Sequence, residues 1–195
     1  MSSEKNPTRT RILKASWKLL EEGGGADVRM SDIAKAAGIS RQALYLHFPT
    51  RAELLVETTR YLDEFYDIQG QLAATRAAVT GRDRLREWVA VWGDYIPKVY
   101  GMSKALLAMK DSDAEVAAAW QDRMQAVRDG CAAAVAALRR DAILSPDLSE
   151  TQATDLLWTL LSVRTWEHLR QECGWSQESY LAEMQRAATR LLIVT

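Results

Sequence analysis

The chain has 195 residues, of which 48% are apolar and 26% are charged, and it contains only 4 prolines. This composition excludes a disordered protein, and no apolar run approaches the roughly 18 residues of a membrane-spanning helix. Ala, Leu, Glu, Gln and Arg are abundant and β-branched alternation is nearly absent, which predicts an all-α fold with no membrane partner.

Charge is unevenly spread along the chain, although the net charge is only −1. Residues 1–51 contain nine of the 25 Lys and Arg and five of the 26 Asp and Glu, which leaves 16 basic and 21 acidic residues in the rest. Such asymmetry is typical of a basic module that faces an anionic partner, although ordinary solvated helix faces explain it equally well.

The two cysteines, Cys131 and Cys173, lie far apart and have no zinc-ligand spacing, and the first residues, MSSEKNPTRTR, form no apolar signal segment. We therefore expect a protein of the reducing cytoplasm, without a disulfide framework, a bound metal or a cofactor.

The first two predicted helices have clear boundaries. Asn6 is suited to cap a helix that begins at Pro7, and the glycines at 23–25 end it. A short helix is predicted over residues 30–37, and Gly38 stops it.

The next two helices are also marked by capping residues. Ser40 caps a third helix, which ends before Pro49. Thr50 and Glu53 form a capping box that opens a longer fourth helix.

The remainder of the chain carries further helical patterns. After a break at Gly81, an apolar stripe from Leu85 to Ile96 is predicted to end at Pro97, and Gly93 with Pro97 is expected to loosen that helix. A shorter helix is expected after Pro97 and ends near residue 109. Three more are expected from 112 to about 138, from 149 to about 172, and from 176 to about 191, which makes about nine helices in total.

The second and third helices form a helix-turn-helix pattern around Gly38, whose conformational freedom suits a tight turn. Apolar side chains at helical spacing would lock the two helices together: Ile33, Ala34, Ile39, Leu44 and Phe48.

The polar side chains of the third helix suit the DNA major groove. Arg41 can donate two hydrogen bonds to guanine, Gln42 can pair with adenine, and Ala43 can touch a thymine methyl group. Tyr45 and His47 can donate to phosphates. Taken one at a time, Tyr45 is better explained as a half-buried packing residue and His47 as a surface histidine, so the interpretation depends on their shared context.

That context is a resemblance to a known family. The stretch from Arg9 to Thr58, with "RILKAS", "DIAKAAGIS", "LYLHF" and "TRAELL" in order, resembles the DNA-binding domain of TetR-family transcriptional regulators. The resemblance covers about a quarter of the chain. It implies a helix-turn-helix domain over 1–50, followed by a helical domain over 51–195 that binds an effector and forms a homodimer.

The resemblance also implies which residues contact double-stranded DNA. Two departures from the family pattern stand out: Arg29 replaces the usual Ser or Thr cap, and Gln42 replaces a small residue. Lys5, Arg9 and Arg11 are candidates for a DNA-contacting arm. The DNA-binding residues expected are Arg29, Ser40, Arg41, Gln42, Ala43, Tyr45, His47 and Arg51.

The C-terminal part is rich in tryptophan and methionine, which suit a cavity for a flat apolar ligand, with simple core packing as the alternative for each residue. The ligand-binding residues expected are Trp88, Trp92, Tyr95, Met109, Trp120, Met124, Trp158 and Arg164.

The last two helices carry apolar stripes suited either to a dimer interface or to packing within one subunit. Together these observations predict a ligand-responsive regulator, in the family's usual mode a repressor, that binds palindromic operator DNA as a dimer and is released by a small apolar or aromatic effector. The alternative is a helical protein-binding adaptor without DNA binding. An enzyme is not expected, because no nucleophile with an adjacent base and no phosphate loop occurs. The members of the two apolar stripes are Leu157, Leu160, Leu161, Tyr180, Met184, Ala187 and Leu191.

Overall fold

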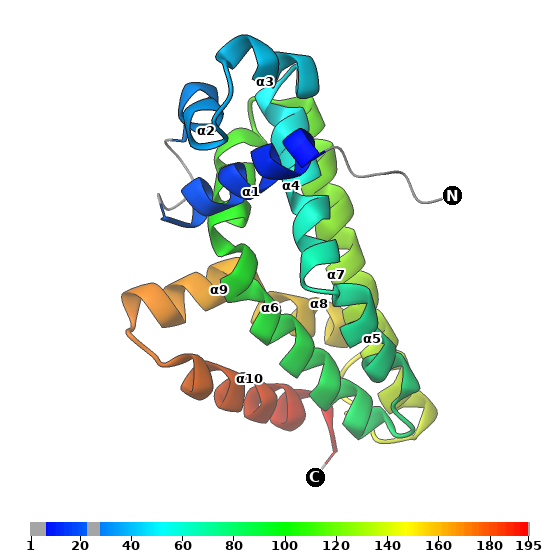
Figure 1. The fold of residues 1–195 in the computed structure, drawn as a ribbon. Helices are drawn as coiled ribbons and strands as arrows, with labels where there is room; N and C mark the ends of the chain where they lie inside the picture. The colour runs from blue at the N-terminus through cyan, green and yellow to red at the C-terminus, as the bar shows by residue number, and fades with distance from the viewer. Residues whose placement is uncertain (1–6, 23–27, 195) are drawn as a thin grey trace, which may run out of the picture. The chain divides into compact units, whose positions relative to one another are not determined.

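The computed structural model describes residues 7–22 and 28–194, and in these ranges every regular element is helical, which confirms the predicted all-α fold. None of the described helices is long and apolar enough to cross a membrane. These ranges contain ten α-helices and one short π-helix (Figure 1): α1 (Pro7–Glu22), α2 (Met30–Ala36), α3 (Arg41–His47), α4 (Arg51–Phe65), α5 (Ile68–Ala77), α6 (Gly81–Met109), α7 (Ala114–Arg140), α8 (Glu150–Leu160), α9 (Val163–Glu167), η1 (His168–Glu172) and α10 (Gln177–Leu192).

The chain forms two compact units. Unit 1 comprises Met1–Tyr66 and Val99–Asp122, and unit 2 comprises Asp67–Lys98 and Arg123–Thr195. Helices α6 and α7 therefore each contribute to both units.

Unit 1 has an apolar core formed by α1 to α4 (Figure 1). Leu44 and Phe48 are fully buried in it, as the helix-turn-helix pattern predicts, and Ile39 is partly buried against it. Their burial fixes one face of α3 and leaves the opposite face to solvent. The buried members are Ile12, Leu13, Met30, Ile33, Ala34, Ala37, Leu44, Phe48 and Leu54.

Unit 2 is held together by aromatic and aliphatic packing. The Trp88 ring lies against Gly130, where any side chain would collide with it. The Trp88 indole N–H donates to Sγ of Cys131 at 3.3 Å. Burial raises the pKa of Cys131 to about 12, so this thiol is protonated at neutral pH and unsuited to nucleophilic chemistry.

Most of the residues in the apolar stripes of α8 and α10 are buried inside unit 2. Four of the seven stripe residues are buried within the subunit, Leu160 and Ala187 are half-buried, and Leu191 is 40% exposed. Packing within the subunit therefore accounts for most of the two stripes. The four buried residues are Leu157, Leu161, Tyr180 and Met184.

Helix α6 continues through Pro97, where the sequence pattern predicted an end, so this prediction is wrong. A proline inside a helix has no N–H to donate to the carbonyl four residues earlier, here that of Gly93. The side chain of Gln177 in α10 supplies the missing donor, with Nε2 at 3.0 Å from the Gly93 oxygen. Its Oε1 in turn accepts from the indole N–H of Trp166 at 3.0 Å.

Two other predicted helices are divided. Asp67 adopts a left-handed conformation (φ 45°) between α4 and α5, and its side chain accepts a hydrogen bond from the Gly70 N–H at 3.2 Å. Ser162 interrupts the helix expected from 149 to about 172, because its hydroxyl accepts from the Thr165 N–H at 3.1 Å and so begins α9. Short polar side chains that bond to nearby backbone compete in this way with helix continuation.

Candidate functional site

The turn between α2 and α3 is built as its sequence predicts. Gly38 has φ +66°, a left-handed conformation that favours glycine. The Ile39 N–H donates to the Ala34 carbonyl at 3.0 Å, which closes the end of α2. Ser40 then caps α3, since its hydroxyl accepts from the Ala43 N–H at 3.1 Å.

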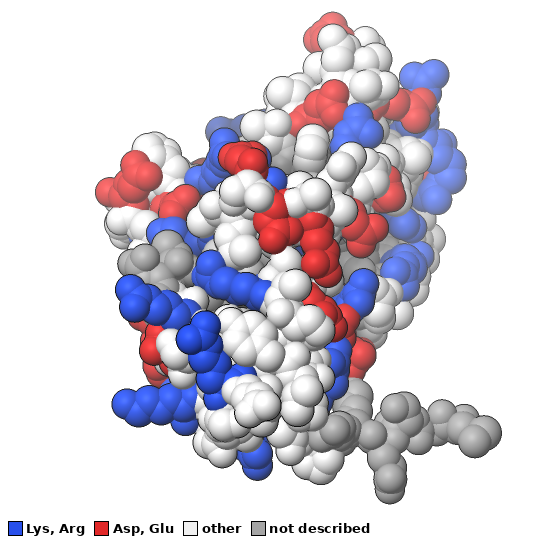
Figure 2. Space-filling model, turned by 90° about the horizontal axis from the view of Figure 1, so that it is seen from above, with Lys and Arg blue, Asp and Glu red and all other residues white. Residues whose placement is uncertain are grey.

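Helix α3 presents a polar face to solvent. Arg41, Gln42 and Tyr45 are exposed, while Ala43 and His47 are half-buried. Figure 2 looks down on the side where α2 and α3 lie at the top of Figure 1, and blue Lys and Arg groups border a white, uncharged area in its lower part.

Two of these exposed side chains are coupled. A guanidinium nitrogen of Arg41 lies 3.4 Å from the hydroxyl oxygen of Tyr45, and its central carbon lies 5.6 Å from the centre of the Tyr45 ring. One turn of helix separates the two residues, so the contact orders both side chains on the exposed face.

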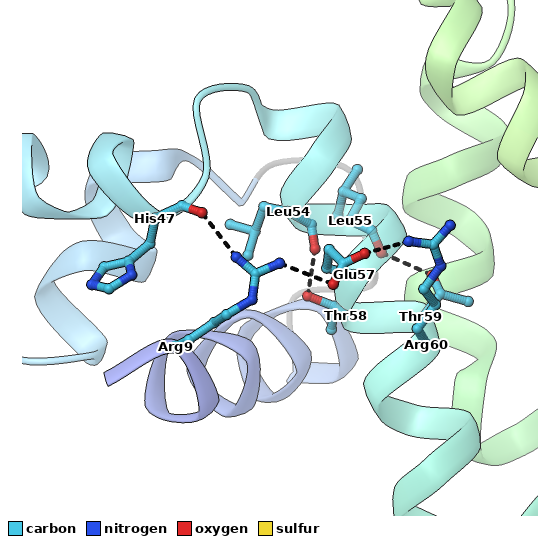
Figure 3. Close-up of polar contacts among 8 residues, drawn as sticks. All are labelled: Arg9, His47, Leu54, Leu55, Glu57, Thr58, Thr59 and Arg60. Atoms are coloured by element: carbon cyan, nitrogen blue, oxygen red, sulfur yellow. Dashed lines mark hydrogen bonds and ion pairs between the residues drawn. The ribbon is translucent and has the colours of Figure 1, made fainter. Parts of the chain in front are cut away.

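Arg9 fixes the far end of α3 (Figure 3). Its guanidinium donates to the His47 carbonyl at 3.0 Å and to a Glu57 carboxylate oxygen at 2.9 Å, and lies 4.2 Å above the centre of the Phe48 ring. Glu57 also pairs with Arg60 at 2.5 Å. Arg9 thus ties α1 and α4 to the C-terminal end of α3.

This cluster perturbs the Glu57 carboxylate. Burial raises its pKa, but hydrogen bonds and charge from Arg9 and Arg60 outweigh burial and hold the pKa below its usual value. Local sequence patterns do not predict this cluster, because Arg9 and Glu57 are 48 positions apart. Of the other candidates for an arm, Arg11 is exposed and Lys5 lies outside the described residues.

The segment that contains α2 and α3 also matches a known protein family. Residues 12–58 match the sequence model of the family described as bacterial regulatory proteins, tetR family. Residues 12–58 thus form a DNA-binding domain of the TetR family. That description names regulatory proteins, which agrees with the expectation that the chain is not an enzyme.

Curated relatives match over part of the chain. The nucleoid occlusion factor SlmA of Marinomonas sp. (strain MWYL1) is 39% identical over 64 residues, which is 33% of this chain and 32% of the relative. The transcriptional regulator EthR of Mycobacterium tuberculosis is 30% identical over 115 residues, or 58% of this chain and 53% of the relative. The chain thus spans about half or less of these relatives.

Solved structures match over nearly the whole chain. One is described as a transcriptional regulator from Saccharomonospora viridis in complex with choline. It has a TM-score of 0.82 at 18% identity, and the match covers 96% of this chain and 98% of that protein. A TetR transcription regulator from Haloarcula marismortui has a TM-score of 0.72 at 20% identity, and the match covers 94% of this chain and 95% of that protein. These likenesses confirm the two-part TetR fold.

The two other arginines expected at the DNA lie at the starts of helices. Arg29 precedes α2 and is exposed, with its N–H donating to an Asp32 carboxylate oxygen at 3.2 Å. Arg51 opens α4 but is half-buried: one guanidinium nitrogen lies 3.0 Å from Sδ of Met109, and the other is buried without a hydrogen-bond partner. Burial lowers the pKa of Arg51.

The residues expected to bind an effector fall in both units. Met109 and Trp120 belong to unit 1, where both are half-buried. In unit 2, Trp88 and Tyr95 are buried, Trp92, Met124 and Trp158 are half-buried, and Arg164 is exposed.

Within unit 2, two of these residues are neighbours. The Trp92 and Tyr95 rings lie 5.8 Å apart with their planes at 50°, and the Trp92 indole N–H donates to the Leu161 carbonyl at 2.8 Å. An effector site formed by these residues stays a prediction.

Proposed function

We propose that this protein is a ligand-responsive transcriptional repressor of the cytoplasm. It binds palindromic operator DNA as a homodimer and is released by a small apolar or aromatic effector. The observation that carries this proposal is α3, a capped helix with one face buried in unit 1 and an exposed polar face.

The exposed face of α3 supplies the chemistry for base recognition. Arg41 would donate to guanine and Gln42 would pair with adenine in the major groove. Tyr45 and His47 would donate to phosphates, which position the helix without reading sequence. Because Arg41 already contacts Tyr45, a base contact and a phosphate contact would be coupled.

A homodimer would present two such helices. Recognition helices related by a two-fold axis bind half-sites about 34 Å apart along the duplex. The proposed contact uses the outer sides of α8 and α10, where Leu156 and Leu191 are 39% and 40% exposed. Exposed apolar side chains on neighbouring helices suit a four-helix interface.

The effector would act by favouring a conformation that binds the operator less tightly. Trp92 and Tyr95 provide adjacent aromatic surfaces in unit 2 for an apolar ligand. Coupling between two sites of this kind is typically about 1–3 kcal/mol.

The test is selection of genomic DNA fragments by the purified protein, with and without a panel of apolar aromatic compounds. A recovered palindrome that one compound releases would support each part of the proposal. Failure to enrich any DNA at low salt would overturn it and favour a protein-binding adaptor.

A further inference from the structure

Unit 1 contains a hollow along the C-terminal half of α1 and the end of α4, two helices that pack against each other. Its volume is about 510 Å³, within the range of small-molecule sites, and its walls are mainly apolar. Its lining residues are Lys14, Trp17, Lys18, Glu21, Glu22 and Phe65.

Aromatic rings form the apolar wall of this hollow. Trp17 lies 5.0 Å from Phe65 and 5.7 Å from Tyr66, centre to centre, and Phe65 lies 5.1 Å from Tyr66 with the planes at 87°. Phe65 is nevertheless 53% exposed. Edge-to-face packing leaves ring faces, which carry partial negative charge, available to a ligand.

A carboxylate stands beside these rings. One Glu21 oxygen accepts from the Gly101 N–H at 3.1 Å, and the other is buried without a hydrogen-bond partner. Burial raises the pKa of Glu21, and burial together with the Glu21 charge raises that of Tyr66. Lys18 pairs instead with Glu22, at 3.8 Å.

We propose that this hollow binds a hydrophobic organic cation, with Trp17 and Phe65 contacting its apolar surface and Glu21 supplying the opposite charge. Cations bind the faces of aromatic rings, most strongly that of tryptophan. The site lies within unit 1 and is separate from the effector site proposed in unit 2, so it does not depend on the proposed function.

The test compares two probes of nearly equal shape and opposite charge, tetraphenylphosphonium and tetraphenylborate, by isothermal titration calorimetry on the full chain. The wild type should bind the cation at least tenfold more tightly than the anion. Glu21→Gln, which keeps an acceptor for Gly101, should weaken cation binding by about tenfold. Equal affinity for both probes would overturn the proposal.

Matched variants locate the site. Glu115→Gln removes the same charge from an exposed position of unit 1 outside the lining and should change cation affinity less than twofold. Phe65→Ala should weaken binding, whereas Trp92→Ala in unit 2 should not. Loss of binding on Trp92→Ala with retention on Phe65→Ala would place the cation elsewhere and overturn the proposal.

Discussion

Replacing Gln177 with alanine isolates the contact that lets α6 continue through Pro97. The change removes the donor to the Gly93 carbonyl and the acceptor for the Trp166 indole, both at 3.0 Å. Leaving a buried polar group unpaired costs about 1–3 kcal/mol. Because Gln177 is only half-buried, we expect each unpaired group to lower the free energy of unfolding by about 1 kcal/mol, or about 2 kcal/mol in total.

Pro97→Ala restores a backbone N–H that can donate to the Gly93 carbonyl. In the Pro97→Ala background, Gln177→Ala should leave only the Trp166 indole N–H unpaired, which should lower the free energy of unfolding by about 1 kcal/mol. The two substitutions should therefore be coupled by about 1 kcal/mol. Urea unfolding of the four proteins in this cycle measures the coupling. Equal costs of Gln177→Ala in both backgrounds would refute the reasoning.

Gln185 provides the matched control. Its Nε2 also donates from α10 to a carbonyl of α6, that of Arg86, at 3.3 Å. The residue four positions after Arg86 is Ala90 and not a proline, so this carbonyl has an ordinary helical N–H donor. Gln185→Ala should therefore show no coupling with Pro97→Ala.

Three further changes test the candidate site. Ser40→Ala should lower the free energy of unfolding by about 1 kcal/mol, whereas Ser31→Ala, at an exposed position in α2, should not. Arg51→Leu should leave stability unchanged or higher, because it removes a half-buried cation of which one nitrogen has no hydrogen-bond partner. The same change should reduce the salt dependence of DNA binding by the equivalent of one phosphate contact. The lowered pKa of Glu57 means that its stabilisation is present above the unfolded pKa near 4.5 and is lost as pH falls through the folded value. Arg9→Met should flatten this acid loss in pH-dependent unfolding, and an unchanged profile would contradict the assigned role of Arg9.

Local signals explain why the helix-turn-helix segment could be predicted from sequence. Gly38 and Ser40 act on backbone within four residues of themselves, and Leu44 and Phe48 follow helical spacing. Such short-range patterns can be recognised in the sequence without knowledge of the rest of the fold.

Long-range partners explain what the sequence did not reveal. The donor that allows α6 to pass Pro97 comes from Gln177, 84 residues away, and Arg9 meets Glu57 across 48 residues. Helical spacing also identifies an apolar face without saying what covers it. Tyr180 and Met184 therefore suited a dimer interface or a subunit core equally well, and the structure buries them in the subunit.

Central to the proposed function is that α3 reads bases through Arg41. The most direct measurement is the affinity of the wild type and Arg41→Ala for a selected operator and for random DNA over a range of salt concentrations. We predict a loss of about 1–3 kcal/mol on the operator and a much smaller loss on random DNA. Equal losses on both would contradict base reading by Arg41, and no operator preference in the wild type would contradict the proposal as a whole.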